Sequence, residues 1–236
     1  MNKIPITDVD LNALKALDPI LSKHIETVPK PVKYYAESFF ICIVTTLIGQ
    51  LISSKSAETI YNRLESLLEE VNVENFLAAA ESEVIECGIY KKKYDQIYKI
   101  AKNLRSGILD FQDLVLKDDK EVEEILCQYP GVGKWSAEMI MIFGLKRKDI
   151  ISFGDFGVRS GIKKVYNLDS LSKKEFKEIK SRLSPYGTIA SLYFWQAHMK
   201  EWFYERNYCS WCRPCWPRSS NGSVKYASKG KTYYLK

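Results

Sequence analysis

The chain has 236 residues, 46% of them hydrophobic, which is enough to bury the core of one domain or of two small lobes. Its 35 Lys and Arg outnumber its 29 Asp and Glu, and the formal net charge of +6 favours a polyanionic partner without identifying one. The N-terminus lacks the basic start and apolar centre of a secretory signal, and the longest apolar stretch (38–52) is shorter than the roughly 20 residues of a membrane span. We therefore expect a cytoplasmic protein, without membrane association, whose cysteines are reduced.

Apolar residues recur at helical rather than alternating spacing through most of the chain. Two such sets are Leu11, Leu14, Leu17 and Leu21, and Ile60, Leu64, Leu67 and Leu68. Breaks fall at Pro29 and Pro31, Gly88, Gly107, Pro130-Gly131, Gly144 and Pro185 to Gly187. This pattern predicts an all-α fold of roughly ten short helices over residues 1–206, followed by an irregular tail over residues 207–236.

The first informative segment is IGQLISSKSAETIYNRL, residues 48–64. Leu51 stands between Gln50 and a polar run, and a leucine taken alone is far more often a core residue than a functional one. Ser53, Ser54 and Lys55 have side chains that could contact phosphate groups.

Residues 118–144, DDKEVEEILCQYPGVGKWSAEMIMIFG, predict two helices joined by a tight turn. Pro130 ends the first helix, while Gly131 and Gly133 permit a turn too tight for side chains. The exposed main-chain N–H groups at the start of the second helix, with Lys134 beside them, would suit a phosphate oxygen. The alternative is a helical hairpin whose glycines serve packing alone.

The segment ISFGDFGVRSGIKKVY follows about twenty residues later and places Asp155 at the start of a helix. The commonest role of an aspartate at such a position is to cap the helix, and the local pattern alone does not exclude it. A later helix, in PYGTIASLYFW, contains Trp195, which is equally compatible with a core and with a binding pocket.

The cysteines give little evidence for metal binding. Cys42, Cys87 and Cys127 lie in helical patterns and are expected to be buried thiols. Cys209, Cys212 and Cys215 form C-x2-C-x2-C in the tail, which leaves a site incomplete unless His198 or another group joins it. We assign no metal there and expect free thiols.

The hexamer PGVGKW, the Ser-Ala that follows it and the spacing to Asp155 resemble the helix-hairpin-helix DNA glycosylases, and within them the 3-methyladenine type most closely. The resemblance runs from about Phe39 to Trp202. It implies two helical lobes with a cleft between them and a catalytic role for Asp155. It also implies that Gly131, Gly133 and Lys134 bind DNA and that the carbonyls of the turn hold a monovalent cation.

The same resemblance assigns the remaining site residues. Leu51 would intercalate where the base is extruded, with Gln50 beside it and Ser53 on the phosphate backbone, while Trp135, Met139 and Trp195 would line the base pocket. Relatives that also cut the strand have a lysine two residues after the second hairpin glycine, where this chain has Trp135. The resemblance therefore implies hydrolysis without abasic lyase activity.

The implied protein is a monofunctional DNA glycosylase of base excision repair that flips and releases alkylated purines such as 3-methyladenine and 7-methylguanine. It would act as a monomer on damaged duplex DNA, in the cytoplasm or on a bacterial nucleoid, and would require no cofactor. Two alternatives are the same fold acting on other damaged or mismatched bases, and a binder of damaged DNA without catalysis.

Overall fold

The structure, a computed structural model, describes residues 2–199, 224–228 and 231–235. These residues contain thirteen helices, so the all-α prediction is confirmed. The helices are α1 (Asp8–Leu17), α2 (Pro19–Glu26), α3 (Phe39–Ile48), α4 (Ser54–Leu68), α5 (Val73–Ala78), α6 (Glu81–Glu86), α7 (Lys91–Arg105), α8 (Phe111–Leu116), α9 (Asp119–Cys127), α10 (Lys134–Phe143), α11 (Phe156–Tyr166), α12 (Lys173–Leu183) and α13 (Gly187–Met199).

The predicted breaks fall in the connections between helices, apart from Gly187, which is the first residue of α13. Three of the helices, α5, α6 and α8, have only six residues each and are too short to show a repeating apolar face, which explains why the periodicity indicated fewer elements. Most helices begin at a Ser, Thr, Asp or Asn whose side chain accepts a main-chain N–H, as Asp118 does for α9 in a capping box with Glu121.

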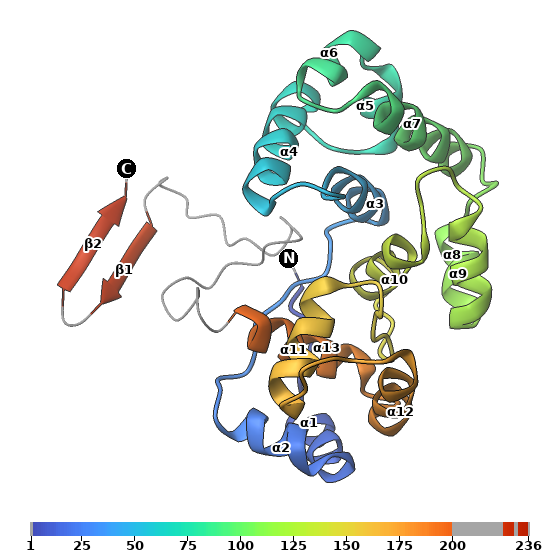
Figure 1. The fold of residues 1–236 in the computed structure, drawn as a ribbon. Helices are drawn as coiled ribbons and strands as arrows, with labels where there is room; N and C mark the ends of the chain where they lie inside the picture. The colour runs from blue at the N-terminus through green and yellow to red at the C-terminus, as the bar shows by residue number, and fades with distance from the viewer. Residues whose placement is uncertain (1, 200–223, 229–230, 236) are drawn as a thin grey trace.

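The helices form two groups with α10 between them (Figure 1). Helices α4 to α7 gather with α3 at one end, and α1, α2, α11, α12 and α13 gather at the other. Helix α10 packs against both α3 and α9, and all but its first two residues are buried. The residues that lead into α11 therefore reach the middle of the molecule, where the two groups meet.

Helices α11 and α13 approach each other very closely at Gly161. A Cβ atom built on Gly161 would lie 1.9 Å from the carbonyl oxygen of Phe194, which is far inside any real contact distance. Only glycine fits at this crossing. The backbone contact fixes the distance between the two helices, one of which begins after Asp155 while the other carries Trp195.

Two expectations about the cysteines and the tail were wrong. Cys42 and Cys87 are buried, but Cys127 is exposed because the last turn of α9 points Leu126, rather than its neighbour, into the core. In the tail, β1 (Val224–Ser228) and β2 (Lys231–Leu235) pair antiparallel with Val224 opposite Leu235. The short apolar and tyrosine-rich runs on either side of Lys229-Gly230 account for a hairpin where no helical period could be seen.

Among the helices that the structure describes, none is long and apolar enough to cross a membrane.

Candidate active site

Asp155 is a buried carboxylate at the N-terminus of α11. The residue is 3% exposed, and its Oδ1 atom accepts the main-chain N–H of Val158 at 2.8 Å, so it caps the helix. The partial positive charge at a helix N-terminus favours an anion at this position. The capping role foreseen as an alternative is therefore present, and it does not exhaust the contacts of the carboxylate.

Two indole N–H groups also donate to Asp155. Trp135 Nε1 lies 2.9 Å from Oδ2, and Trp195 Nε1 lies 2.9 Å from Oδ1. The tryptophans come from α10 and α13, 20 residues before and 40 residues after the aspartate. Three N–H donors converge on a group that can only accept when it is ionised, so the arrangement is built for a carboxylate held in one orientation.

All of these donors are neutral. Among the described residues, no Lys, Arg or His nitrogen lies within ion-pair distance of Asp155. His198 is nearby, but its Nδ1 contacts Ser160 Oγ at 2.9 Å, and burial, followed by the positive charge of Lys164, lowers the pKa of its ring. The negative charge of Asp155 is thus oriented and left without a cationic partner.

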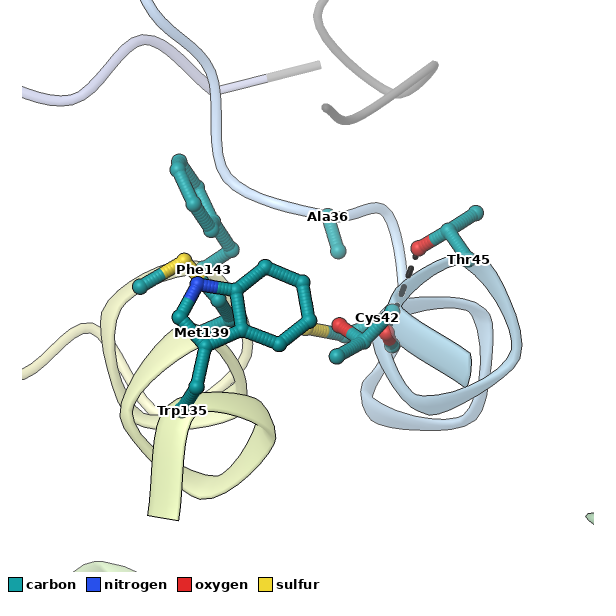
Figure 2. Close-up of a pocket in the computed structure, with 7 residues that line it drawn as sticks. Ala36, Cys42, Thr45, Trp135, Met139 and Phe143 are labelled. Atoms are coloured by element: carbon teal, nitrogen blue, oxygen red, sulfur yellow. Dashed lines mark hydrogen bonds between the residues drawn. The ribbon is translucent and has the colours of Figure 1, made fainter. Parts of the chain in front are cut away.

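A small pocket lies between α3 and α10, next to this carboxylate. Its lining comes from Ala36, Cys42, Thr45, Thr46, Trp135, Met139 and Phe143. Figure 2 shows the indole of Trp135 extending from α10 across the space toward α3, with Met139 beside it. Because its ring lines the pocket while its N–H contacts Asp155, Trp135 connects the pocket directly to the carboxylate.

The predicted pocket residues occupy different positions. Trp135 and Met139, which the resemblance assigned to a base pocket, both line this pocket. Trp195 is 6% exposed and is not among the lining residues; its ring stacks on Phe143 with centroids 5.9 Å apart. Trp195 therefore reaches the site through its N–H group, which donates to Asp155, and not as a lining residue of the pocket.

The hairpin between α9 and α10 has the geometry that its sequence predicts. Gly131 has a φ of +84°, in the left-handed region, and a Cβ there would lie 2.3 Å from the side chain of Gln96. Gly133 caps α10 without any side-chain hydrogen bond, and a Cβ there would meet only open space. The first N–H groups of α10 are consequently left uncovered by side chains, a suitable seat for an anion.

Lys134 faces away from the pocket, as the 100° rotation per residue predicts. Its Nζ atom contacts both carboxylate oxygens of Glu123 on α9 at 2.6 Å, and its side chain remains 61% exposed. The lysine is therefore paired within the hairpin and still accessible to a second anion.

Gln50 connects the α3–α4 loop to the hairpin. Its Nε2 atom donates to Gly131 O and to Ser136 Oγ, each at 2.8 Å. Leu51, the next residue, is fully exposed and has a φ of +61°. A leucine in the left-handed region, with its whole side chain in water, incurs two costs in the folded chain at once.

The other predicted contacts are only partly accounted for. Ser53 accepts the N–H of Ser56 and caps α4, so its hydroxyl is already engaged. Cys209, Cys212 and Cys215 lie outside the described residues. Within the part of the chain that is described, no cluster of three or more His, Cys, Asp or Glu side chains could hold a metal ion.

Two residues of this region were missed by sequence reasoning. Lys93, from α7, donates to three main-chain carbonyls beside Leu51. Phe156, directly after Asp155, is 68% exposed and stands edge-on to the ring of His198 with centroids 5.3 Å apart. No local pattern marks Lys93, whereas an aromatic residue at the first position of a helix after a suspected catalytic group could have been noticed.

The fold and the site agree with a comparison of the sequence with known protein families. Residues 44–185 match the model of the HhH-GPD superfamily base excision DNA repair proteins, and the chain belongs to this family. The resemblance stated from the hairpin and Asp155 is confirmed.

Within this family, the chain is similar to several DNA-3-methyladenine glycosylases. The chain is 27% identical over 165 residues to DNA-3-methyladenine glycosylase 1 of Schizosaccharomyces pombe, covering 65% of this chain and 70% of that protein. It is 30% identical over 138 residues to the DNA-3-methyladenine glycosylase of Saccharomyces cerevisiae, covering 54% of this chain and 47% of the yeast protein. The crystal structure of a DNA-3-methyladenine glycosidase from Bacillus halodurans superimposes with a TM-score of 0.73 at 30% identity, covering 84% of this chain and 93% of that one.

Proposed function

We propose that the protein is a monofunctional DNA glycosylase that hydrolyses the N-glycosidic bond of alkylated purines, such as 3-methyladenine and 7-methylguanine, in base excision repair. The observation that carries the proposal is the Asp155 carboxylate, buried beside the pocket and oriented by three neutral N–H donors. The names of its relatives, which are 3-methyladenine glycosylases in yeasts and in a Bacillus, support the substrate class.

The chemistry requires stabilisation of the sugar more than activation of the base. Alkylation at N3 or N7 makes the purine cationic, so the base leaves as a neutral molecule without being protonated first. The electron-poor sugar left behind develops positive charge at C1′, which an unpaired carboxylate can offset. Asp155 would also orient or deprotonate the attacking water. An Asp155 neutralised by its own cation would do this poorly.

The pocket and the surface residues would divide the remaining tasks. An electron-poor purine stacks well on the face of Trp135, with Met139 beside it. The uncovered N–H groups at the start of α10 and the exposed Lys134 would hold the phosphate backbone, which positions a protein without reading sequence. Leu51 would fill the space that the extruded base leaves in the duplex.

The hairpin would hold a monovalent cation through main-chain carbonyls. Gly131 O accepts one hydrogen bond, from Gln50, and a carbonyl oxygen has a second lone pair for an ion. The reaction itself needs no cofactor, and a single chain supplies the carboxylate, the pocket and the hairpin, so we propose a monomer.

Trp135 bears on the reaction outcome. A Schiff base with the abasic sugar needs a primary amine in the site, and the side chain that faces the carboxylate here is an indole. The neighbouring amine, Lys134, is held on Glu123 and points away from the pocket. We therefore propose hydrolysis alone, without cleavage of the strand.

The decisive experiment is incubation of the protein with methylated duplex DNA, with chromatographic identification of the bases released and electrophoresis of the strand before and after alkali. We expect 3-methyladenine and 7-methylguanine in solution and strand breaks only after alkali. Breaks without alkali would contradict the monofunctional proposal, and release of only oxidised or deaminated bases would favour the other lesion classes. Tight binding with no base released would identify a non-catalytic binder.

A further inference from the structure

The α3–α4 loop holds Leu51 in an unfavourable conformation that burial of its side chain does not offset. The residue is fully exposed and its φ is +61°. A left-handed non-glycine residue costs of order 1–3 kcal/mol and persists only where its surroundings impose it. Contacts around the loop must therefore hold Leu51 in this conformation.

Lys93 supplies the constraint from α7. Its Nζ atom donates to the carbonyl oxygens of Leu47 at 2.6 Å, Ile48 at 3.0 Å and Gln50 at 3.1 Å. An ammonium group has three N–H donors, and all three are used. Leu47 and Ile48 belong to the last turn of α3, where helix carbonyls have no partner inside the helix, and Gln50 lies two residues beyond the end of the helix.

The contact also suits the charge of the lysine. The carboxyl end of a helix carries partial negative charge, and Lys93 places its cation on it. The side chain is partly buried, and this burial lowers the pKa of its amine, so holding the group there has a cost that a merely solvated lysine would avoid. The neighbouring Lys92 is exposed and provides a natural comparison.

The loop is thus fixed from two sides. Lys93 holds the main chain before and at Gln50, and the Gln50 side chain is held by Gly131 and Ser136 of the hairpin. Ser53 begins α4 directly afterward. Leu51 lies between these anchors, so its backbone has little freedom to return to the ordinary region.

We propose that Lys93 is a positioning residue for base extrusion: by donating to the carbonyls of Leu47, Ile48 and Gln50 it fixes Leu51 in its projecting, left-handed conformation before DNA binds. The inference rests on the proposed function, in which Leu51 enters the duplex. Lys93 would act entirely through Leu51 and would not touch the reacting atoms. Because the loop is already ordered before DNA binds, the flipping step does not include the loss of conformational entropy of Leu51.

The test measures flipping apart from chemistry. A duplex carries 2-aminopurine beside an alkylated purine, and stopped-flow fluorescence reports unstacking in an Asp155→Asn background. We expect Lys93→Met to slow flipping by about 10- to 100-fold, the scale of loss when a group is misplaced by about 1 Å. Lys93→Arg keeps the charge but offers a planar guanidinium, so its flipping rate should lie between those of the parent and Lys93→Met. Lys92→Met should flip at the parental rate.

A double variant distinguishes positioning from general destabilisation. If Lys93 acts through Leu51, Leu51→Ala combined with Lys93→Met should flip no more slowly than Leu51→Ala alone. Losses that multiply, or a Lys93→Met protein that flips at the parental rate, would overturn the inference. Thermal unfolding of each variant checks the fold, and Lys93→Arg supplies the test if Lys93→Met does not fold.

Failure of the proposed function would look different. A chain with Asp155 intact that releases no alkylated base and unstacks no duplex would remove both proposals together. Release and flipping by the parent, with flipping unaffected in Lys93→Met, would remove only the role of Lys93.

Discussion

Asp18 and Asp155 are two buried aspartates that cap helices, and they differ in whether a cationic side chain contacts the carboxylate. Asp18, 1% exposed, accepts the main-chain N–H groups of Ile20 and Leu21 at the start of α2. Its other oxygen receives Tyr166 Oη and Arg182 Nε, each at 2.7 Å. Asp155 has the same capping role and nearly the same burial, yet its other donors are two indoles.

The difference separates a structural carboxylate from a reactive one. At Asp18, burial alone would raise the pKa, but the hydrogen bonds from Leu21, Tyr166 and Arg182 and the charge of Arg182 outweigh it, so the pKa is lowered. The charge is satisfied inside the protein. At Asp155 the donors orient the carboxylate without cancelling its charge, which leaves it for a cation that arrives later.

Asparagine at each position should give the largest difference between the two sites. Asparagine caps helices as well as aspartate does, so both variants should fold. We expect Asp155→Asn to reduce release of 3-methyladenine by on the order of 10³-fold, since the electrostatic partner of the sugar is lost, while binding to damaged duplex is retained. Single-turnover release and a binding titration would measure the two effects.

Asp18→Asn is the matched control. It should leave release unchanged and lower the free energy of unfolding by about 1–3 kcal/mol, because Arg182 loses its carboxylate partner but is partly exposed. Undiminished release by Asp155→Asn, or inactivation by Asp18→Asn without unfolding, would show that the two aspartates do not divide the roles in this way.

Removing one donor at each site should give a smaller contrast. Trp195→Phe keeps an aromatic ring against Phe143 but removes the N–H from Asp155 Oδ1. We expect release to slow by about tenfold, the lower end of the value of a hydrogen bond to a charged group. Tyr166→Phe removes a donor from Asp18 instead and should lower stability by about 1 kcal/mol while leaving release unchanged. Equal effects of both variants on release would argue against an orienting role for the indole.

A third buried carboxyl, Glu138, should give the smallest effect, and only as a function of pH. Burial raises its pKa, although Ser152 Oγ and the charge of Lys134 oppose the shift. The folded state therefore keeps a proton that the unfolded state has released above about pH 4.5, and this contribution to stability is lost as pH rises through the folded pKa. Glu138→Gln should gain stability relative to the parent between pH 4.5 and neutrality. Denaturant unfolding at both pH values, showing no such trend, would contradict the assignment.

The sequence was most informative where function and local structure coincide. The turn at Gly131, the cap at Asp155 and the inward position of Trp135 all follow from short-range rules of backbone conformation and helical rotation. The helix ends at the predicted breaks followed from Pro and Gly for the same reason, whereas the six-residue helices α5, α6 and α8 were not resolved by the pattern.

Contacts across long separations could not be predicted in this way. Lys93 reaches carbonyls 43 to 46 residues earlier, and Gln50 reaches Gly131 across 81 residues. Nothing in a local window specifies which cation meets which helix end. The contact of Trp195 with Asp155 was missed for a related reason, since the apolar composition of α13 indicates burial but not the direction of the indole N–H.

The close crossing at Gly161 has a consequence for how this site tolerates change. Because main chain meets main chain there, the spacing between the α11 cap and the indole on α13 is set by atoms that no rotamer can adjust. Even one added methyl group would push the two helices apart. A substitution at Gly161, whose own side chain is a single hydrogen atom, would thus reduce activity by displacing the helices that carry the site.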